Sequence, residues 1–194
     1  MNKKVKCLIY CTKANPNLYK PFEYDCFEQD EASRFYLSKI PMLKEETLLN
    51  GKIVAQFDCE KVEKFDVPYP AYFWEVKDEL EHITKGSCLS LMSLHHYLKN
   101  DSGYAIHISN LEIFDEPKEL NDFKLFNPNY YLYTNIKRAP QNMCYVVKEP
   151  PMCFAPSEEY ILISIRPEWV CKILNGEKTI EVRKQVLNTL KELI

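Results

Sequence analysis

The chain has 194 residues, of which 46% are hydrophobic and 13% aromatic, so it is long enough for one domain with a sizeable core and too apolar to be disordered. Its net charge of −3 argues against a protein that coats nucleic acid through bulk positive charge, although a local basic pocket is compatible with it. Its four glycines stand at least 17 residues apart. This spacing excludes the glycine-rich phosphate loops of Rossmann and P-loop proteins, and we expect no cofactor.

The eight cysteines include no Cys-x-x-Cys pair, and several stand in apolar patterns, which predicts reduced thiols in a cytoplasmic protein. No apolar run approaches the roughly 20 residues of a membrane span, and the N-terminal MNKKVKCLIYC does not have the pattern of a signal peptide. His95 and His96 are adjacent on a predicted helix, with no third ligand one turn away. We therefore expect neither a membrane partner nor a metal site.

In chain order, the alternation of apolar and polar residues predicts strands over residues 4–11, 52–65, 103–114, 143–147, 160–165 and 179–182. Apolar residues at helical spacing predict helices over 71–86, from Ser90 to before Asn100, from Pro167 to Asn175, and over the last residues from Val186. Residues 12–50 show no pattern that assigns them. Short strands mixed with short helices, without a βαβ repeat, predict an α+β fold built on a small barrel.

Residues 148–157 contain Pro150, Pro151 and Pro156, and they are expected to be extended. This stretch is the clearest boundary in the chain. It divides the sequence into a main part over 1–149, a proline-rich linker over 150–158 and a C-terminal segment over 159–194.

The C-terminal segment brings a lysine, a glutamate and an arginine together. In a strand that begins at Thr179, Glu181 and Arg183 share one face, while Ile180 and Val182 point to the core. Lys178, in the turn before the strand, can reach the same face, so the three polar side chains are expected together at the mouth of the barrel. The arginine offers a planar fork for a phosphate or a base edge, and a partly buried lysine beside a second cation can act as a base. Alternatively, Glu181 and Arg183 form a surface ion pair on an edge strand.

The run from Ile161 to Lys184 resembles the opening of ASCH domains, which belong to the PUA-like superfamily of small β-barrels. The resemblance rests on Gly-x-Lys-x-x-x-x-Arg with a glutamate two residues before the arginine, here Gly176, Lys178, Glu181 and Arg183. The segments LIYCTK, NGKIVAQFDCEKV, GYAIHISNLEIFDEPKEL and RAPQNMCYV are similar to the later strands of ASCH-type proteins, many of them from Firmicutes and their phages. In that family the motif segment comes first and runs into the strand that corresponds to LIYCTK, whereas in this chain the motif segment comes last. The resemblance therefore implies a circular permutation, with the last segment folding back in a monomer or completing the barrel of a second chain in a swapped homodimer.

The resemblance implies RNA, a nucleotide or a modified nucleoside as the ligand. It assigns the catalytic positions to Lys178 and Glu181, and the ligand-binding positions to Arg183, Arg166, Arg138 and Gln141. One ASCH-type group hydrolyses N4-acetylcytidine with a lysine and a threonine of this motif; Lys178 matches the lysine, but Glu181 stands at the threonine position. Three hypotheses follow: a binding module, a hydrolase of a modified nucleoside or RNA that uses Lys178, and a degenerate phage-type protein without activity.

Overall fold

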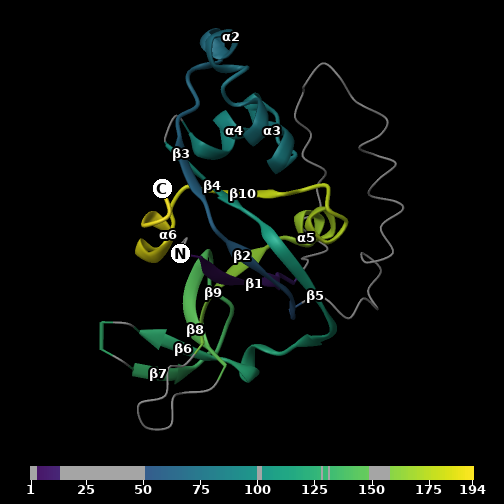
Figure 1. The fold of residues 1–194 in the computed structure, drawn as a ribbon, viewed down its shortest axis with the longest axis vertical. Helices are drawn as coiled ribbons and strands as arrows, with labels where there is room; N and C mark the ends of the chain where they lie inside the picture. Colours follow the sequence, from purple (N-terminus) through teal and green to yellow (C-terminus); the bar gives the residue numbers. More distant parts are fainter. Residues whose placement is uncertain (1–3, 14–50, 100–101, 128, 131, 149–157) are drawn as a thin grey trace.

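The computed structural model describes residues 4–13, 51–99, 102–127, 129–130, 132–148 and 158–194. Most of the unassigned stretch 12–50, and all of the predicted linker 150–158 but its last residue, lie outside them. The described residues form two β-sheets with short helices around them (Figure 1). In that view the helices α2 (Phe73–Val76), α3 (Glu81–Ser87) and α4 (Leu91–Leu98) lie at one end of the long axis. The hairpin of β6 (Lys124–Asn127) and β7 (Leu132–Asn135) lies at the other end.

The larger of the two described sheets has the strand order β5-β2-β1-β9-β8-β6-β7. Its strands are β1 (Val5–Cys11), β2 (Ile53–Cys59), β5 (Ser109–Lys118), β6 (Lys124–Asn127), β7 (Leu132–Asn135), β8 (Met143–Val147) and β9 (Glu159–Ile165). β1 and β9 run parallel in its middle, and the other neighbours are antiparallel. β9 is buried from Tyr160 to Ile165, because Ile161 and Ile163 belong to one hydrophobic core and Leu162 to the core on the other face.

The smaller sheet has the order β10-β4-β3, with antiparallel strands at Ile180–Arg183, Gly103–His107 and Val62–Phe65 respectively. The helices α3 (Glu81–Ser87) and α4 (Leu91–Leu98) share a core with it, in which their apolar residues pack against those of β10. Gly86 allows the close contact, since a Cβ atom there would lie 2.7 Å from Cδ1 of Ile180. The predicted inward orientation of Ile180 and Val182 is confirmed.

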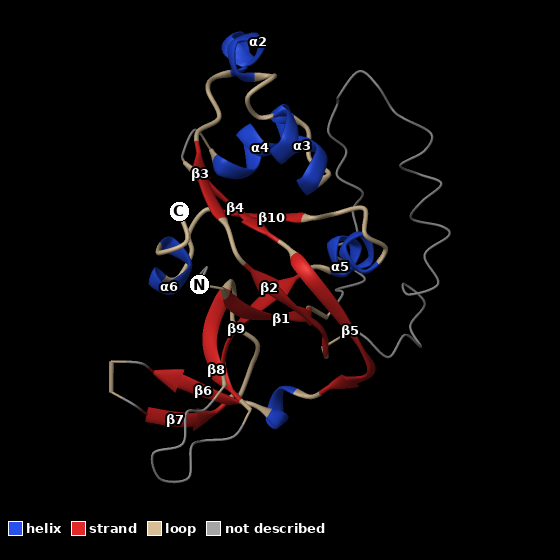
Figure 2. Cartoon of the chain, in the orientation of Figure 1, coloured by secondary structure: helices blue, strands red, loops and turns tan. Residues whose placement is uncertain are grey.

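Two further helices flank the strands on opposite sides of the view in Figure 2: α5 (Pro167–Leu174) and α6 (Asn188–Lys191). Pro167 begins α5, where its missing N–H costs nothing. Val170 and Ile173 of α5 and Leu190 of α6 are fully buried in the core that contains one face of β1 and β9. This packing attaches the C-terminal segment firmly to the main part of the chain.

The predicted helix over 71–86 is divided in the structure. The chain forms a 3₁₀ turn, η2 (Pro70–Tyr72), then α2 (Phe73–Val76), a further turn, and α3. Leu80 and Ile83 reach the core, but Trp74 is 76% exposed. Because a short helix depends on tertiary packing for its stability, the poorly packed first half does not continue into α3.

The predicted closed barrel is wrong, and the α+β class is confirmed: both described sheets are open, and no ladder among the described residues joins β5 to β7. The predicted strand over 52–65 divides into β2 and β3, and the strand over 103–114 divides into β4 and β5, so each carries the chain from one sheet to the other. The two strands of the C-terminal segment also lie in different sheets. β9 pairs with β1 and β8, and β10 pairs with β4, all within this chain.

Candidate functional site

Lys178, Glu181 and Arg183, hereafter the trio, lie in direct contact. Lys178 Nζ is 3.4 Å from Glu181 Oε2, and Arg183 Nε is 2.9 Å from Glu181 Oε1. The second contact is an ion pair but not a hydrogen bond. The N–H of Arg183 Nε does not point at the Glu181 carboxylate, and Nε is buried without a hydrogen-bond partner. The carboxylate of Glu181 therefore lies between two cations, and the trio has a net charge of +1 when Lys178 is protonated.

Lys178 is an interior residue rather than a residue at an open mouth, with a side chain only 2% exposed. Its ammonium donates hydrogen bonds to the backbone carbonyls of Ser87 at 2.9 Å and Ile180 at 2.7 Å. Burial lowers the pKa of Lys178, and the neighbouring charge of Glu181 opposes this effect. With its protons directed at two carbonyls and one carboxylate, Lys178 ties the end of α3 to β10.

Arg183 connects the two sheets. Its Nη2 donates to the backbone carbonyl of Ser164 on β9 at 2.6 Å, and its Nη1 donates to Asn142 Oδ1 at 3.1 Å. Asn142 is itself held, because its amide donates to the carbonyl of Gln185 and its own carbonyl accepts from the backbone N–H of Ser164. The side chain of Arg183, 11% exposed, is thus held by β9 and by the loop that contains Asn142.

The other predicted site residues lie on the surface near these elements. Arg166 directly precedes α5, is 64% exposed, and has its Nη1 3.9 Å from Glu168 Oε1. Arg138 and Gln141 are also exposed. In their loop the side chain that contacts Arg183 is that of Asn142, which directly follows Gln141.

Tyr97 on α4 lies near the charges of the trio, and no sequence pattern singled it out. Its side chain is 43% exposed, and Lys184 Nζ lies 5.6 Å from the centre of its ring. Burial raises the pKa of Tyr97, while the charges of Arg183 and Arg166 lower it and that of Glu181 raises it. The signal that could have found it is its position outside the apolar stripe of α4, which is formed by Leu94 and Leu98.

Trp169 on α5 is a second aromatic neighbour of the trio. Lys178 Nζ lies 5.3 Å and Lys172 Nζ 5.4 Å from the centre of its ring. The indole is half-buried and packs against the core that contains Val170 and Ile173 of the same helix. Its ring therefore contributes cation–π contacts as well as packing.

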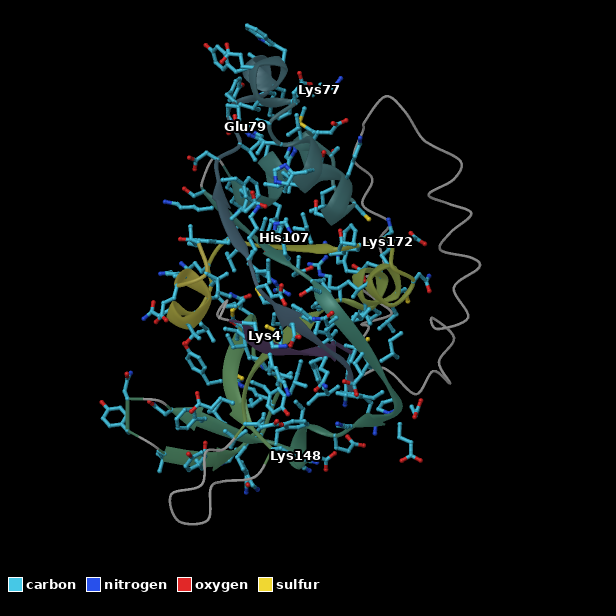
Figure 3. All side chains as sticks on the ribbon, viewed as in Figure 1. Lys4, Lys77, Glu79, His107, Lys148 and Lys172 are labelled. Atoms are coloured by element: carbon cyan, nitrogen blue, oxygen red, sulfur yellow. The ribbon has the colours of Figure 1, made fainter. Side chains whose placement is uncertain are left out.

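A second charged cluster lies on the smaller sheet, around Glu63 of β3. His107 of β4, labelled in Figure 3, contacts Oε1 of Glu63 through its Nε2, and His82 Nε2 lies 3.2 Å from Oε2. Lys61 Nζ is 3.0 Å from Oε1. Burial alone would raise the pKa of Glu63, but the hydrogen bonds from these three residues outweigh it and lower the pKa to about 2.

Within the described parts of the chain, no three histidine, cysteine or acidic side chains are grouped so as to hold a metal ion. A polar hollow on the larger sheet is lined by Lys4, Lys6, Gln56, Phe57, Asp58, Asn110 and Glu112, and it includes none of the predicted site residues. None of the described helices is long and apolar enough to cross a bilayer. The chain matches no family model, no curated protein and no solved structure.

Proposed function

We propose that this protein is an RNA- or nucleotide-binding module of the ASCH type, with its ligand on the surface above the trio. The observation that carries the proposal is the arrangement of Arg183, held by hydrogen bonds on one side of Glu181, with the exposed Arg166 and the half-buried Lys184 nearby. A phosphate at this surface would meet Arg166 and Lys184 directly, and Arg183, whose Nη atoms already donate to Ser164 and Asn142, would add its positive charge from beneath.

Binding is favoured over hydrolysis by the surroundings of Lys178. Its lowered pKa would suit a general base. However, its ammonium is buried and donates to two backbone carbonyls, so that a substrate reaches it only after α3 and β10 move apart. The hydrolase of a modified nucleoside is accordingly the second candidate, and the lowered pKa of Lys178 is the observation in its favour.

The direct test is binding of a fluorescein-labelled RNA 10-mer and of a labelled nucleoside triphosphate, followed by anisotropy at several salt concentrations. We expect saturable binding whose affinity falls with salt, and a salt slope smaller by about one for Arg166→Gln. The same samples are incubated with N4-acetylcytidine and with RNA, and products are separated by chromatography. Turnover that is lost in Lys178→Met identifies the hydrolase instead, and neither binding nor turnover identifies a degenerate protein.

A further inference from the structure

Tyr97 presents an aromatic ring at the surface where cations from two other parts of the chain converge. It comes from α4, Arg166 directly precedes α5, and Lys184 directly follows β10. The ring is 43% exposed, Lys184 Nζ is 5.6 Å from its centre, and the charges of Arg166 and Arg183 both bear on the pKa of its hydroxyl. Residues distant in the sequence thus form one mixed aromatic and basic surface.

The cations of this surface are only weakly neutralised. Among the described residues, Arg166 has one carboxylate within ion-pair distance, that of Glu168 at 3.9 Å, which is the outer limit of an ion pair. In the described part of the chain, no carboxylate lies within ion-pair distance of Lys184. Glu181 is already shared between Lys178 and Arg183. An anion that approaches Tyr97 therefore meets positive charge without having to displace an acidic side chain.

We propose that Tyr97 is the platform on which one unpaired base of a single-stranded RNA stacks, while Arg166 and Lys184 bind the adjacent phosphate. The inference rests on the proposed function and adds the strandedness of the ligand and the residue that reads it. The ring of Tyr97 is 43% exposed, and every base has a π face that can stack on it. Lys184, whose Nζ lies over the ring at 5.6 Å, would then turn from the ring to the adjacent phosphate. A duplex keeps its bases inside the helix and offers this ring only its backbone.

The test is a set of affinities for one RNA sequence in two forms. A labelled 10-mer is titrated as a single strand and as a duplex with wild type, Tyr97→Ala, Tyr97→Phe and Lys184→Gln. Tyr130→Ala is the matched control, because Tyr130 is a 78% exposed tyrosine on the turn between β6 and β7, at the other end of the molecule (Figure 1). Thermal melting of every variant verifies that it is folded.

We expect wild type to bind the single strand more tightly than the duplex. Tyr97→Ala should weaken single-strand binding by about ten-fold to a hundred-fold without changing the salt slope, whereas Tyr97→Phe and Tyr130→Ala should bind as wild type does. Lys184→Gln should reduce the salt slope by about one. If Tyr97→Ala does not fold, the preference for the single strand and the smaller slope of Lys184→Gln decide the matter.

The outcomes separate this inference from the proposed function. If wild type binds neither RNA nor a nucleotide, both are overturned. If wild type binds RNA but Tyr97→Ala binds equally well, or the duplex binds as tightly as the single strand, only the stacking site is overturned. Equal binding of a DNA 10-mer of the same sequence supports the stacking site, since the contacts proposed are to a base and a phosphate.

Discussion

The guanidinium of Arg183 donates a 2.6 Å hydrogen bond to the backbone carbonyl of Ser164, which joins the last strand of the smaller sheet to a central strand of the larger one. The two open sheets are thereby connected by a charged, nearly buried side chain whose other partner in the trio is Glu181. The residue whose charge supports the proposed phosphate site thus also holds the sheets together. Its role in stability can be measured separately from binding.

Arg183→Gln is expected to lower the free energy of unfolding by about 2–4 kcal/mol, because it leaves the buried Glu181 with one cation and removes the hydrogen bond between the sheets. Urea denaturation followed by circular dichroism measures this. Arg166→Gln, at an exposed position, is the control and should change stability by no more than about 0.5 kcal/mol. Equal effects of the two substitutions would show that Arg183 has no structural role.

Lys178→Met should lower stability by about 2–4 kcal/mol as well, since it leaves the buried carbonyls of Ser87 and Ile180 without this donor. Lys172→Met, which removes a half-buried lysine beside the same Trp169, is the matched control, and its effect should stay below about 1 kcal/mol. Chemical denaturation again provides the measurement. A Lys178→Met protein as stable as the control would contradict the role of the ammonium as a tie between α3 and β10.

Glu63 is expected to make stability depend on acidic pH. Its folded-state pKa is about 2, against 4.5 for the ordinary carboxyl, so its contribution is fully present above pH 4.5 and is lost as the pH falls towards 2. After allowance for its partial exposure, the contribution is about 1–2 kcal/mol. Urea midpoints of wild type and Glu63→Gln should therefore differ at pH 6 and converge near pH 2. Glu60→Gln, at an exposed position, should follow wild type throughout, and a constant gap for Glu63→Gln would refute the linkage.

A fragment of residues 1–148 is expected not to fold, because it lacks β9, whose side chains are buried on both faces between β1 and β8. Size-exclusion chromatography and thermal melting test this. The matched control is the full chain with a protease site inserted within 149–157: after cleavage, both pieces are present and should remain associated. A soluble fragment that melts cooperatively without residues 158–194 would contradict the prediction.

Much of the fold is local in origin and could be predicted. The strands near residues 4–11, 143–147 and 160–165 and the helix that begins at Pro167 follow from patterns within a few residues, and all are confirmed. The predictions that were wrong concern which strands pair with one another. The strands predicted over 52–65 and 103–114 each divide between two sheets, because a local pattern shows which residues are extended but not which neighbour they pair with.

The candidate site was likewise predictable only in its local features. Period-2 alternation was enough to place Glu181 and Arg183 on one face of a strand, and the structure brings Lys178 to them. It did not indicate that this face is covered, since the cover comes from Ser87, Ser164 and Asn142, up to 91 residues away along the chain. The three side chains that were expected at the open mouth of a barrel therefore form a buried ionic network.

The sequence by itself determined which residues are strand or helix, which side chains of the last strand point the same way, and that the core of the C-terminal segment is apolar. The tertiary structure alone decided that the sheets stay open, that the Lys178 ammonium donates its hydrogen bonds to backbone carbonyls, and that Lys184 lies over the ring of Tyr97. The physical reason is the distance along the chain over which each interaction acts. Backbone conformation and side-chain alternation depend on neighbours in the chain, whereas burial, charge pairing and access to solvent depend on which distant segments come to lie alongside.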